Sequence, residues 1–416
     1  MELCAGLGGM SLGLEAAGFD PVALIELNSD AAASLRANRR DWNVIKQDMK
    51  QVDYAPHRDR IHLLAGGLPC QPYSRAGKAL GKDDERDLFP AATEIVNAVR
   101  PKAFMFENVD GFNDAKHADH RAEVFARFAE AGYAVRTISV NAKDYGIAQE
   151  RPRIFVIGMS PENMARFRPP PTFEEWRATV GHALEDMMGA GGWSGASRWA
   201  ERRRTQVIVR DNKEEIGGLA STLLGEKRRG REKEIGRWGL REIIIGGTWD
   251  APPTDAMAAA AGDDFMPGLT MPMKARLMGL PDGYVVIGNK ESQSQQIGNA
   301  VVPRVAQAVG LAIYSALLGV DFDWEVVLRH PRLPYERETV DRIEIDAPSL
   351  AYDGRCLERH APFRLRFSDV RKSTIDQALR RTSSRLLLET AHRTENPWSV
   401  RRPRDQRVGG AAGICP

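Results

Sequence analysis

A cysteine in a loop rich in glycine and proline is the most reactive side chain that this sequence offers. Cys70 lies directly after the apolar run 61–65, in the segment Gly66-Gly67-Leu68-Pro69-Cys70-Gln71-Pro72-Tyr73-Ser74. Backbone amides at the carboxyl end of a strand favour the thiolate, which is the reactive form of a cysteine. The flanking glycines and prolines favour an exposed nucleophile over the alternative, a buried structural cysteine. The segment therefore predicts that Cys70 bonds covalently to a substrate.

Charged residues adjoin two further apolar runs. Glu107 ends the run 103–107, and Arg151 and Arg153 stand just ahead of the run 154–158. A carboxyl group in such apolar surroundings should have a raised pKa and hold a proton near neutral pH. Two arginines spaced by two point to the same side of an extended segment, where they could steady an anion or a polarised carbonyl. The alternatives are a helix-capping acid and surface ion pairs.

A glycine-rich turn near the start of the chain indicates a second kind of site. The segment Glu2-Leu3-Cys4-Ala5-Gly6-Leu7-Gly8-Gly9 lets backbone approach a ligand closely, unless it is only a tight turn between strand and helix. Glu26 ends the next apolar run, where an acid accepts hydrogen bonds from ribose hydroxyls. Asp48 ends a third segment and could accept from the exocyclic amine of adenine. Together they predict an adenosine-containing cofactor, and the missing G-x-G-x-x-G spacing argues against NAD.

Alternating strands and helices must position these residues. Apolar runs predict strands at residues 1–4, 22–26, 61–65, 103–107, 134–139 and 154–158. Helical patterns between them cover residues 10–17, 31–39, 89–99 and 121–131. This order predicts an α/β fold, a doubly wound and mostly parallel sheet of Rossmann-like type, with ligands at the carboxyl ends of the strands.

The composition and the pattern of apolar residues change after the first domain, which covers residues 1–160. Residues 161–270 are rich in Gly, Arg and Trp and are predicted to form a separate, irregular part. Residues 271–320 are expected to return to the first domain, with a helix at 305–318. Residues 321–416 are expected to be an extension, and roughly its last twenty residues to be disordered.

Composition sets broad limits on the function. The 416 residues are 43% hydrophobic and 27% charged, as in ordinary globular proteins. The four cysteines form no CxxC pair and no metal-ligand spacing, so neither a metal nor a disulfide framework is expected. We find no apolar run of membrane-spanning length and no signal pattern, and expect a cytoplasmic protein without a membrane partner.

The distribution of charge is more informative than the net charge of +2. Residues 198–242 hold 13 Lys and Arg against 8 Asp and Glu, and residues 351–416 hold 14 against 7. Basic regions beside a nearly neutral body suit a protein that meets phosphates at particular faces, although a solvated surface has the same composition.

In this order and spacing, the segments closely resemble the cytosine-5 DNA methyltransferases of bacteria and phages. The resemblance covers residues 2–158 and resumes over residues 271–310. Its most specific feature is the ordered combination of Pro69-Cys70-Gln71, Glu107-Asn108-Val109 and Gln149-x-Arg151-x-Arg153. The family's last two motifs resemble Ala275-Arg276-Leu277-Met278-Gly279-Leu280-Pro281-Asp282 and Gln296-Ile297-Gly298-Asn299-Ala300-Val301-Val302-Pro303.

The resemblance implies S-adenosylmethionine as the methyl donor and no metal. Cys70 would add to carbon 6 of a cytosine flipped out of double-stranded DNA, which activates carbon 5 for methylation. Glu107 would hydrogen-bond ring nitrogen 3 and the amino group, and Arg153 with Arg151 would contact the carbonyl oxygen and help hold Cys70. The cofactor site would be lined by Gly6, Leu7, Gly8, Gly9, Glu26, Asp48, Leu88, Asn299 and Val301.

The resemblance also assigns residues 161–270, hereafter the recognition region, the choice of a DNA sequence. Thr222-Leu223 resembles a Thr-hydrophobic pair of that region in the family. Two basic stretches, Arg202-Arg203-Arg204 and Lys227-Arg228-Arg229-Gly230-Arg231, would contact phosphates, and single arginines could instead read guanine. The enzyme would act as a monomer and would belong to, or protect against, a restriction-modification system.

Two departures from the family pattern concern the first motif. Cys4 stands where the family usually has phenylalanine beside the cofactor, which predicts weaker packing against adenine or S-adenosylmethionine. The family also has several more strand residues before this motif. We therefore expect either a short first strand or a natural start upstream of Met1.

Three other readings compete with a DNA methyltransferase. A tRNA cytosine methyltransferase would share these motifs, but its short recognition region with a Cys-Phe-Thr segment is missing here. A non-catalytic DNA-binding protein on a degenerate scaffold would be expected to lack Cys70, Glu107 or Arg153. A nicotinamide oxidoreductase is the third alternative, which detectable NAD binding would support.

Overall fold

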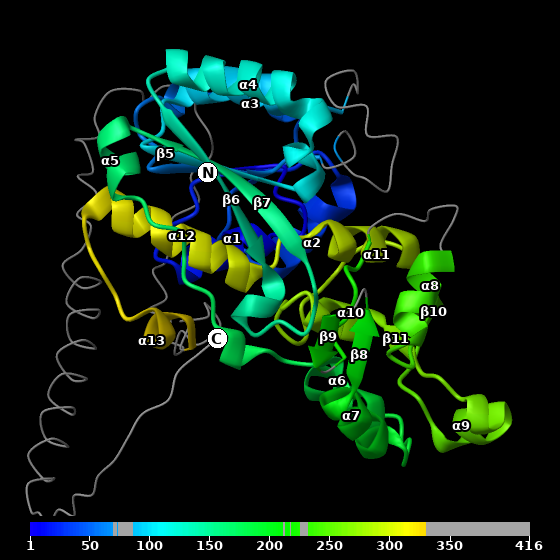
Figure 1. Cartoon of the computed structure of the whole chain (residues 1–416). Helices are drawn as coiled ribbons and strands as arrows, with labels where there is room; N and C mark the ends of the chain where they lie inside the picture. The colour runs from blue at the N-terminus through cyan, green and yellow to red at the C-terminus, as the bar shows by residue number, and fades with distance from the viewer. Residues whose placement is uncertain (70–72, 74–85, 211–212, 217, 225–231, 330–416) are drawn as a thin grey trace, which may run out of the picture. The chain divides into compact units, whose positions relative to one another are not determined.

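A seven-stranded sheet is the frame of the protein (Figure 1). The structure is a computed structural model, and it describes residues 1–69, 73, 86–210, 213–216, 218–224 and 232–329. The strand order is β3-β2-β1-β4-β5-β7-β6. The strands are β1 (Glu2–Leu3), β2 (Leu24–Ile25), β3 (Val44–Ile45), β4 (Leu63–Gly67), β5 (Ala103–Asn108), β6 (Ala134–Asn141) and β7 (Pro152–Met159).

Most of the sheet is parallel, as predicted. Strands β3, β2, β1, β4 and β5 pair in parallel, whereas β7 runs antiparallel to both of its neighbours, β5 and β6. All six predicted strands are present, and the predicted doubly wound α/β fold is confirmed. The sequence did not predict β3 as a strand, because two residues are too few to show an alternating pattern.

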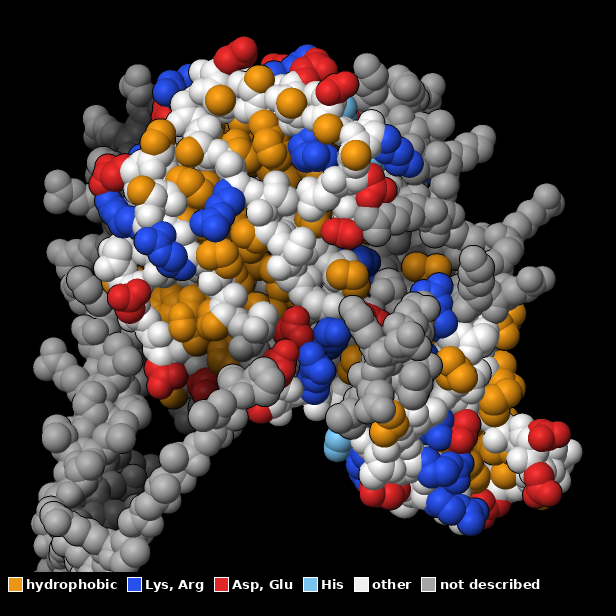
Figure 2. All heavy atoms as spheres, in the orientation of Figure 1, with side chains coloured by type: hydrophobic (Ala, Val, Ile, Leu, Met, Phe, Trp, Pro, Cys, Tyr) orange, Lys and Arg blue, Asp and Glu red, His pale blue; other side chains and the backbone are white. Residues whose placement is uncertain are grey.

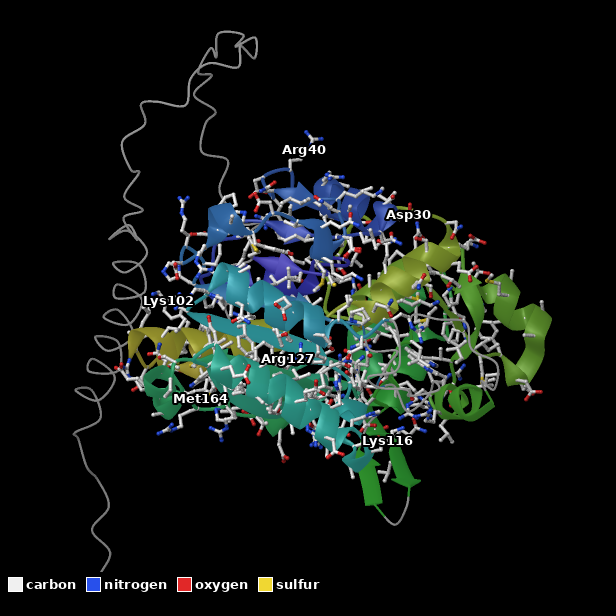
Figure 3. The ribbon with its side chains drawn as sticks, turned by 90° about the horizontal axis from the view of Figure 1, so that it is seen from above. Asp30, Arg40, Lys102, Lys116, Arg127 and Met164 are labelled. Carbon is white, nitrogen blue, oxygen red and sulfur yellow. The ribbon has the colours of Figure 1, made fainter. Side chains whose placement is uncertain are left out.

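The central strands are buried on both faces and send alternate side chains into two apolar cores. Phe104 and Phe106 of β5 enter one core together with α3 (Phe89–Val99) and α4 (Ala118–Glu130). Met105, between them, enters the other core together with α1 (Gly9–Ala16) and α12 (Pro303–Leu318). This alternation follows from the two-residue period of a strand. Figure 3 looks onto the face that α3 and α4 cover, with the labelled Arg127 on α4.

The recognition region is more regular than predicted. Its helices are α5 (Pro161–Arg166), α6 (Val180–Gly189), α7 (Ala196–Thr205), α8 (Glu232–Gly239) and α9 (Asp255–Ala261), and its strands are β8 (Val207–Arg210), β9 (Lys213–Ile216), β10 (Ile244–Trp249) and β11 (Gly268–Thr270). The prediction of an irregular part is therefore wrong. Thr179 caps α6 with His182 in place of the usual Glu or Gln, which hides this helix start from the sequence pattern.

The predicted boundaries of the recognition region do not coincide with breaks in packing. Helix α5, which begins at Pro161, contacts α12, and Phe167 is fully buried in the core on that side of the sheet. Val180 and Trp199 belong to the same continuous core. The recognition region thus shares its hydrophobic core with the sheet, although the chain leaves the sheet after β7.

The last described segments return to the sheet. They are α10 (Met271–Leu277), α11 (Lys290–Asn299), α12 and α13 (Trp324–Arg329). Gln307 of α12 donates a hydrogen bond to the carbonyl of Val327 at 3.2 Å, and Leu328 is fully buried. The described beginning of the predicted extension is therefore part of the core, and residues 330–416 lie outside the described residues.

One stretch of this return meets the length and hydropathy of a membrane span, contrary to the sequence expectation. It is Lys290–Leu318, which comprises α11 and α12, and 67% of its apolar window is buried inside the fold. Such burial is typical of a core helix. Helix α12 packs along α1, and a β-carbon on Gly9 of α1 would lie 2.0 Å from the carbonyl oxygen of Val301. Only glycine permits this approach, which joins the first and last motifs.

Candidate functional site

A cavity of about 590 Å³ opens beside the carboxyl ends of β1 and β2. Its volume is within the usual range of small-molecule sites. Glu26, Asp48 and Leu88, three of the predicted cofactor residues, line it. Its other lining residues are Cys4, Ile25, Leu27, Asn28, Ser29, Gln47, Met49 and Pro69. The cavity therefore combines apolar walls with two carboxyl groups.

Glu26 is fixed by the backbone around it. Its two carboxylate oxygens accept hydrogen bonds from the amide of Gly6 and the amide of Asn28, each at 2.6 Å. Gly6 has a φ of +54°, a conformation that favours glycine, and this turn directs its N–H at the acid. Each carboxylate oxygen has a further lone pair, so the acid can still accept from a ligand.

Cys4 adds an unreactive thiol to this cavity. Its Sγ lies 3.5 Å from the sulfur of Met49. Burial, together with the nearby carboxyl groups of Glu26, Glu2 and Asp48, raises the pKa of the Cys4 thiol to about 12. The side chain therefore remains a neutral thiol near pH 7 and acts as a small wall of the cavity.

The remaining predicted cofactor residues lie outside the cavity lining. Leu7 is buried, and its carbonyl accepts a 2.8 Å hydrogen bond from the hydroxyl of Tyr284. Gly8 caps the start of α1, and Gly9 contacts Val301 as described above. Asn299, the last residue of α11, is exposed. These residues shape the turn or join the first and last motifs, whereas Gly6 is linked to the cavity through Glu26.

Glu107 and Arg153 form an ion pair on adjacent strands. Glu107 on β5 is opposite Phe155 on β7, so Arg153, two residues away, is a diagonal neighbour on the same face. The Nε of Arg153 lies 2.8 Å from the carboxylate of Glu107. Burial raises the pKa of the Glu107 carboxyl, and the positive charges of Arg153 and Arg151 offset only part of this effect. The acid therefore holds its proton more tightly than an exposed glutamate.

Arg151 has different partners from Arg153, although the sequence predicted that they would act together. Its side chain is buried and donates to the carbonyls of Leu223, Gly298 and Ala300 at 2.8–3.0 Å. Leu223 belongs to the recognition region, and the other two lie at the end of α11 and just after it. Arg151 therefore holds three parts of the chain together at one point.

The predicted nucleophile Cys70 lies outside the described residues, but its neighbours in the chain are described. Gly67 is opposite Glu107 in the parallel pair β4 and β5. A β-carbon on Gly67 would lie 3.9 Å from both the Glu107 carboxylate and the carbonyl of Cys4. Asn108 approaches the carbonyl of Leu68 at 3.5 Å. The segment that leads to Cys70 therefore runs between the acid and the cavity.

The recognition region is tied to this site through Gln149 and Thr222. Gln149 is buried, donates to the carbonyl of Leu277 at 2.8 Å and accepts from the amide of Leu223 at 3.1 Å. Thr222 donates to the carbonyl of Glu150 at 2.7 Å. The Thr-Leu pair is thus a structural joint in this chain.

The arginines at 202–204, which were predicted to contact phosphate, form ion pairs with glutamates. Arg203 is buried and pairs with Glu242, which also binds Arg202, and Arg204 pairs with Glu185. Figure 2 shows basic and acidic side chains next to one another over α6 and α7. The prediction of phosphate contact is therefore wrong for Arg203. The second basic stretch, residues 227–231, lies outside the described residues.

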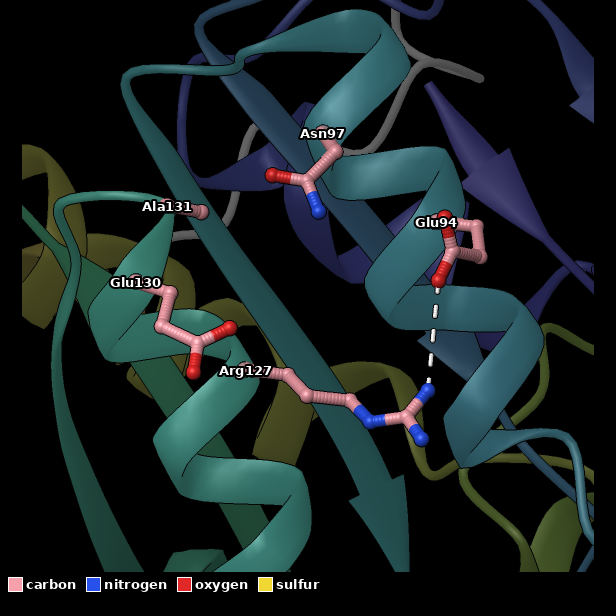
Figure 4. Close-up of a pocket in the computed structure, with 5 residues that line it drawn as sticks. All are labelled: Glu94, Asn97, Arg127, Glu130 and Ala131. Carbon is pink, nitrogen blue, oxygen red and sulfur yellow. Dashed lines mark ion pairs between the residues drawn. The ribbon is translucent and has the colours of Figure 1, made fainter.

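A second, polar depression lies on the outer side of α3 and α4 (Figure 4). It is lined by Glu94, Asn97, Arg127, Glu130 and Ala131. Arg127 and Glu94 are 3.9 Å apart and largely exposed, so their attraction is weak. Its lining residues are exposed or half-buried, and it lies on the face of the sheet that Phe106 enters, opposite to the face of Glu107. Among the described residues no group of three His, Cys, Asp or Glu side chains is placed to hold a metal ion.

Two residues near the site have no counterpart among the predicted ones. Tyr284 binds the glycine-rich turn from the last block, and His120 on α4 binds Tyr73, three residues after Cys70. Neither has a local sequence signal, because each partner is distant in the chain. From the sequence pattern, His120 is one more residue of an amphipathic helix, with no indication of a special partner.

Relatives of known class cover most of this chain. It is 39% identical over 320 residues to the Type II methyltransferase M.NgoMIV of Neisseria gonorrhoeae, covering 76% of this chain and 97% of that protein. It is 37% identical over 329 residues to the Type II methyltransferase M.NaeI of Lentzea aerocolonigenes, covering 76% and 75%.

Solved structures support the fold. A DNA modification methyltransferase from an Escherichia coli prophage matches with a TM-score of 0.51 at 20% identity, over 76% of this chain and 98% of that one. A mutant of Spodoptera frugiperda DNMT2 matches with a TM-score of 0.51 at 15% identity over the same shares. The family model of the C-5 cytosine-specific DNA methylases matches residues 1–315. The chain therefore belongs to the family of C-5 cytosine-specific DNA methylases.

Proposed function

We propose that this DNA cytosine-5 methyltransferase acts through Cys70 as its nucleophile and Glu107 as the acid that binds the target base. The Cys70 thiolate adds to carbon 6 of an extruded cytosine, and the electron pair of the 5,6 double bond becomes available at carbon 5. S-adenosylmethionine supplies the methyl group to that carbon. A base then removes the carbon 5 proton, the double bond re-forms and the thiolate leaves. The covalent step is needed because carbon 5 alone is a weak nucleophile.

Glu107 stabilises the adduct by hydrogen bonding ring nitrogen 3 and the amino group of the cytosine. Its raised pKa supports this role, because a carboxyl that retains a proton can donate to ring nitrogen 3. Arg153 orients the acid through the 2.8 Å contact of its Nε, and its Nη1 donates to the carbonyl of Pro152 at 2.7 Å. We assign its Nη2 to the carbonyl oxygen of the base. We assign Arg151 a positioning role, because the acceptors described above are backbone carbonyls of three segments.

The cavity fits a nucleoside with two hydrogen-donating ends. Glu26 would accept from the ribose hydroxyls, and Asp48 would accept from the exocyclic amine of adenine. Leu88, Ile25 and Met49 supply apolar surface for the base. We therefore propose S-adenosylmethionine as the occupant. Cys4 leaves more room beside it than the phenylalanine usual in the family would leave.

The recognition region selects the DNA sequence in this proposal, and the enzyme belongs to a restriction-modification system or protects DNA against one. Its attachment through Gln149, Arg151 and Thr222 supports a fixed position next to the catalytic acid. A fixed position is needed because the base that is methylated must be the base that the region selects.

The observation that carries the proposal is the approach of β4 to both parts of the site: a β-carbon on Gly67 would lie 3.9 Å from the Glu107 carboxylate and from the carbonyl of Cys4. This approach supports Cys70, three residues further along the chain, as the nucleophile. The test uses duplex DNA containing 5-fluorocytosine, which traps the adduct because fluorine cannot leave as a proton does. We expect wild type to form a stable covalent complex in the presence of S-adenosylmethionine, and Cys70→Ser to form none.

Methylation with labelled S-adenosylmethionine then separates the remaining alternatives. Incorporation into duplex DNA but not into tRNA is expected, and bisulfite sequencing of the product gives the modified cytosine and its flanking bases. Equal or greater labelling of tRNA would overturn the choice of DNA. A Cys70→Ser variant that methylates at the wild-type rate would overturn the choice of nucleophile.

A further inference from the structure

The chain on the far side of Cys70 is anchored by a buried tyrosine. Tyr73 is 1% exposed and is surrounded by the rings of Phe89, Phe112 and His117, with ring centroids 5.9, 4.9 and 5.2 Å away. Three residues of chain span at most about 10 Å, so the position of Tyr73 limits where Cys70 can be. The fixed point on the other side of Cys70 is Pro69, which lines the cofactor cavity.

His120 binds this tyrosine by its only polar group. The Nε2 of His120 lies 3.0 Å from the Tyr73 hydroxyl and 2.8 Å from the carboxylate of Asp87. A carboxylate only accepts, so Nε2 carries a hydrogen that it shares between Asp87 and the Tyr73 oxygen. The side chains of His120 and Asp87 are 8% and 4% exposed, which shields this contact from competing water.

Asp87 extends the contact to the start of α3. Its other oxygen accepts from the amide of Phe89 at 3.1 Å, and the next residue, Leu88, lines the cofactor cavity. One imidazole on α4 therefore holds two chain positions, 73 and 87, that are separated by fourteen residues in the sequence. One of these positions follows the nucleophile, and the other precedes a wall of the cofactor site.

We propose that His120 is a positioning residue for methyl transfer, which sets the distance of Cys70 from the target base by holding Tyr73 against Asp87. The inference rests on the proposed function of Cys70. His120 on α4 is not among the residues that line the cofactor cavity, so it acts through Tyr73 and Asp87. Its effect is therefore on the geometry of attack, where a displacement of about 1 Å can cost about 100-fold in rate.

The test compares variants of two buried histidines that both lie next to Tyr73. His120→Leu removes the polar contact, and His120→Gln restores an N–H donor near the position of Nε2. His117→Leu is the matched control, because His117 is 6% exposed and packs on the Tyr73 ring, but its Nε2 has no hydrogen-bond partner among the described residues. The measurements are the rate of adduct formation with 5-fluorocytosine DNA, the Kd for S-adenosylmethionine and the Tm.

We expect His120→Leu to slow adduct formation by about 10- to 100-fold, with the Kd for S-adenosylmethionine within about twofold of wild type. His120→Gln should recover most of the rate, and His117→Leu should retain it. The inference is overturned if His120→Leu reacts within twofold of wild type, or if both leucine variants lose rate and Tm together. A wild-type enzyme that forms no adduct would instead overturn the proposed function of Cys70.

Discussion

Two regions of the molecule each pair a glutamate with arginines, but the pKa values of the two carboxyl groups shift in opposite directions. Glu107 in the sheet is 7% exposed, and burial raises the pKa of its carboxyl despite Arg153 and Arg151. Burial also acts on Glu242 in the recognition region, but hydrogen bonds and charges from Arg202 and Arg203 outweigh it, and the pKa of Glu242 is lowered. Its side chain is 34% exposed.

The difference suits the two acids to different roles. Glu242 binds two guanidinium groups directly and is stabilised as an anion. Glu107 has one such partner at hydrogen-bond distance and is deprived of water, so its charged form is disfavoured. In the proposed function, the raised pKa of Glu107 favours proton donation to the target base, whereas the lowered pKa of Glu242 suits an ionised partner of two arginines.

The largest effect is expected from Glu107→Gln, which keeps the size of the side chain and removes its titratable proton. We expect the methylation rate on duplex DNA to fall by about 100- to 10,000-fold, the usual contribution of an acid–base group. Glu242→Gln is the matched control and should retain the rate per folded molecule. Initial rates with labelled S-adenosylmethionine measure both, and equal losses in the two variants would show that the two acids do not differ in role.

Arg151→Met tests whether Arg151, which links the sheet to the recognition region, contributes more to stability than the Arg203–Glu242 pair within the recognition region. The variant leaves the carbonyls of Leu223, Gly298 and Ala300 without their charged donor, so the free energy of unfolding should fall by about 3 kcal/mol. Arg203→Met should cost less, because Arg202 remains bound to Glu242. Urea denaturation measures both variants, and an equal or greater loss from Arg203→Met would contradict the expectation.

Glu2, beside the glycine-rich turn, makes stability depend on pH. Burial raises the pKa of its carboxyl to about 8, and the hydroxyl of Ser11 donates to it. The folded state thus holds a proton that the unfolded state releases from about pH 4.5 upward. This contribution to stability is complete below that pH and is lost as the pH rises to about 8, by up to about 1.4 kcal/mol per pH unit.

Glu2→Gln removes this contribution and isolates it from the neighbouring amino group. Burial lowers the pKa of the Met1 amino group to about 6, so its own contribution rises with pH above that value. Burial, the larger cause of the shift of the amino group, is common to wild type and Glu2→Gln, whereas the charge of Glu2 is the smaller cause. Most of the amino-group contribution therefore cancels in the difference in unfolding free energy between the two proteins, which should decrease from pH 5 to pH 8. A difference that stays constant over this range would show that Glu2 is ionised in the fold.

The smallest effect is expected from Tyr284→Phe, which removes the hydrogen bond from the last block to the carbonyl of Leu7. One neutral hydrogen bond contributes about 1 kcal/mol, so the Kd for S-adenosylmethionine should rise by about fivefold. Tyr133→Phe loses a 2.7 Å bond to the carbonyl of Pro101, away from the cavity, and should leave the Kd unchanged. Calorimetric titration measures both, and an unchanged Kd for Tyr284→Phe would show that the turn holds its shape alone.

The sheet and much of the candidate site could be predicted because both depend on local patterns. The apolar runs that form β4, β5 and β7 are continuous, and the predicted catalytic residues stand next to an end of each run. Glu26, Asp48 and Leu88 line the cavity because the ends of β2 and β3 and the start of α3 meet there. Once the fold is known, the order of the strands brings these three residues together.

The remaining features depend on contacts between distant residues. The sequence shows Arg202-Arg203-Arg204 as a free basic run, since Glu242 stands forty residues away. The sequence alone makes Arg151 and Arg153 look equivalent. No local pattern indicates that Arg151 binds backbone carbonyls whereas Arg153 binds the carboxylate of Glu107. His120 escaped prediction for the same reason, because Tyr73 and Asp87 reach it only in the folded chain.

The partners of Arg151 described above are all main-chain oxygens, so the joint that it forms asks nothing of the side chains that it connects. At position 223, a substitution that preserves the backbone and the packing of the side chain in the shared core would therefore keep this contact. In the proposed function, residues 161–270 could therefore diverge outside these contacts, which are the Leu223 carbonyl, the Thr222 hydroxyl and the shared core, while Arg151 keeps its place.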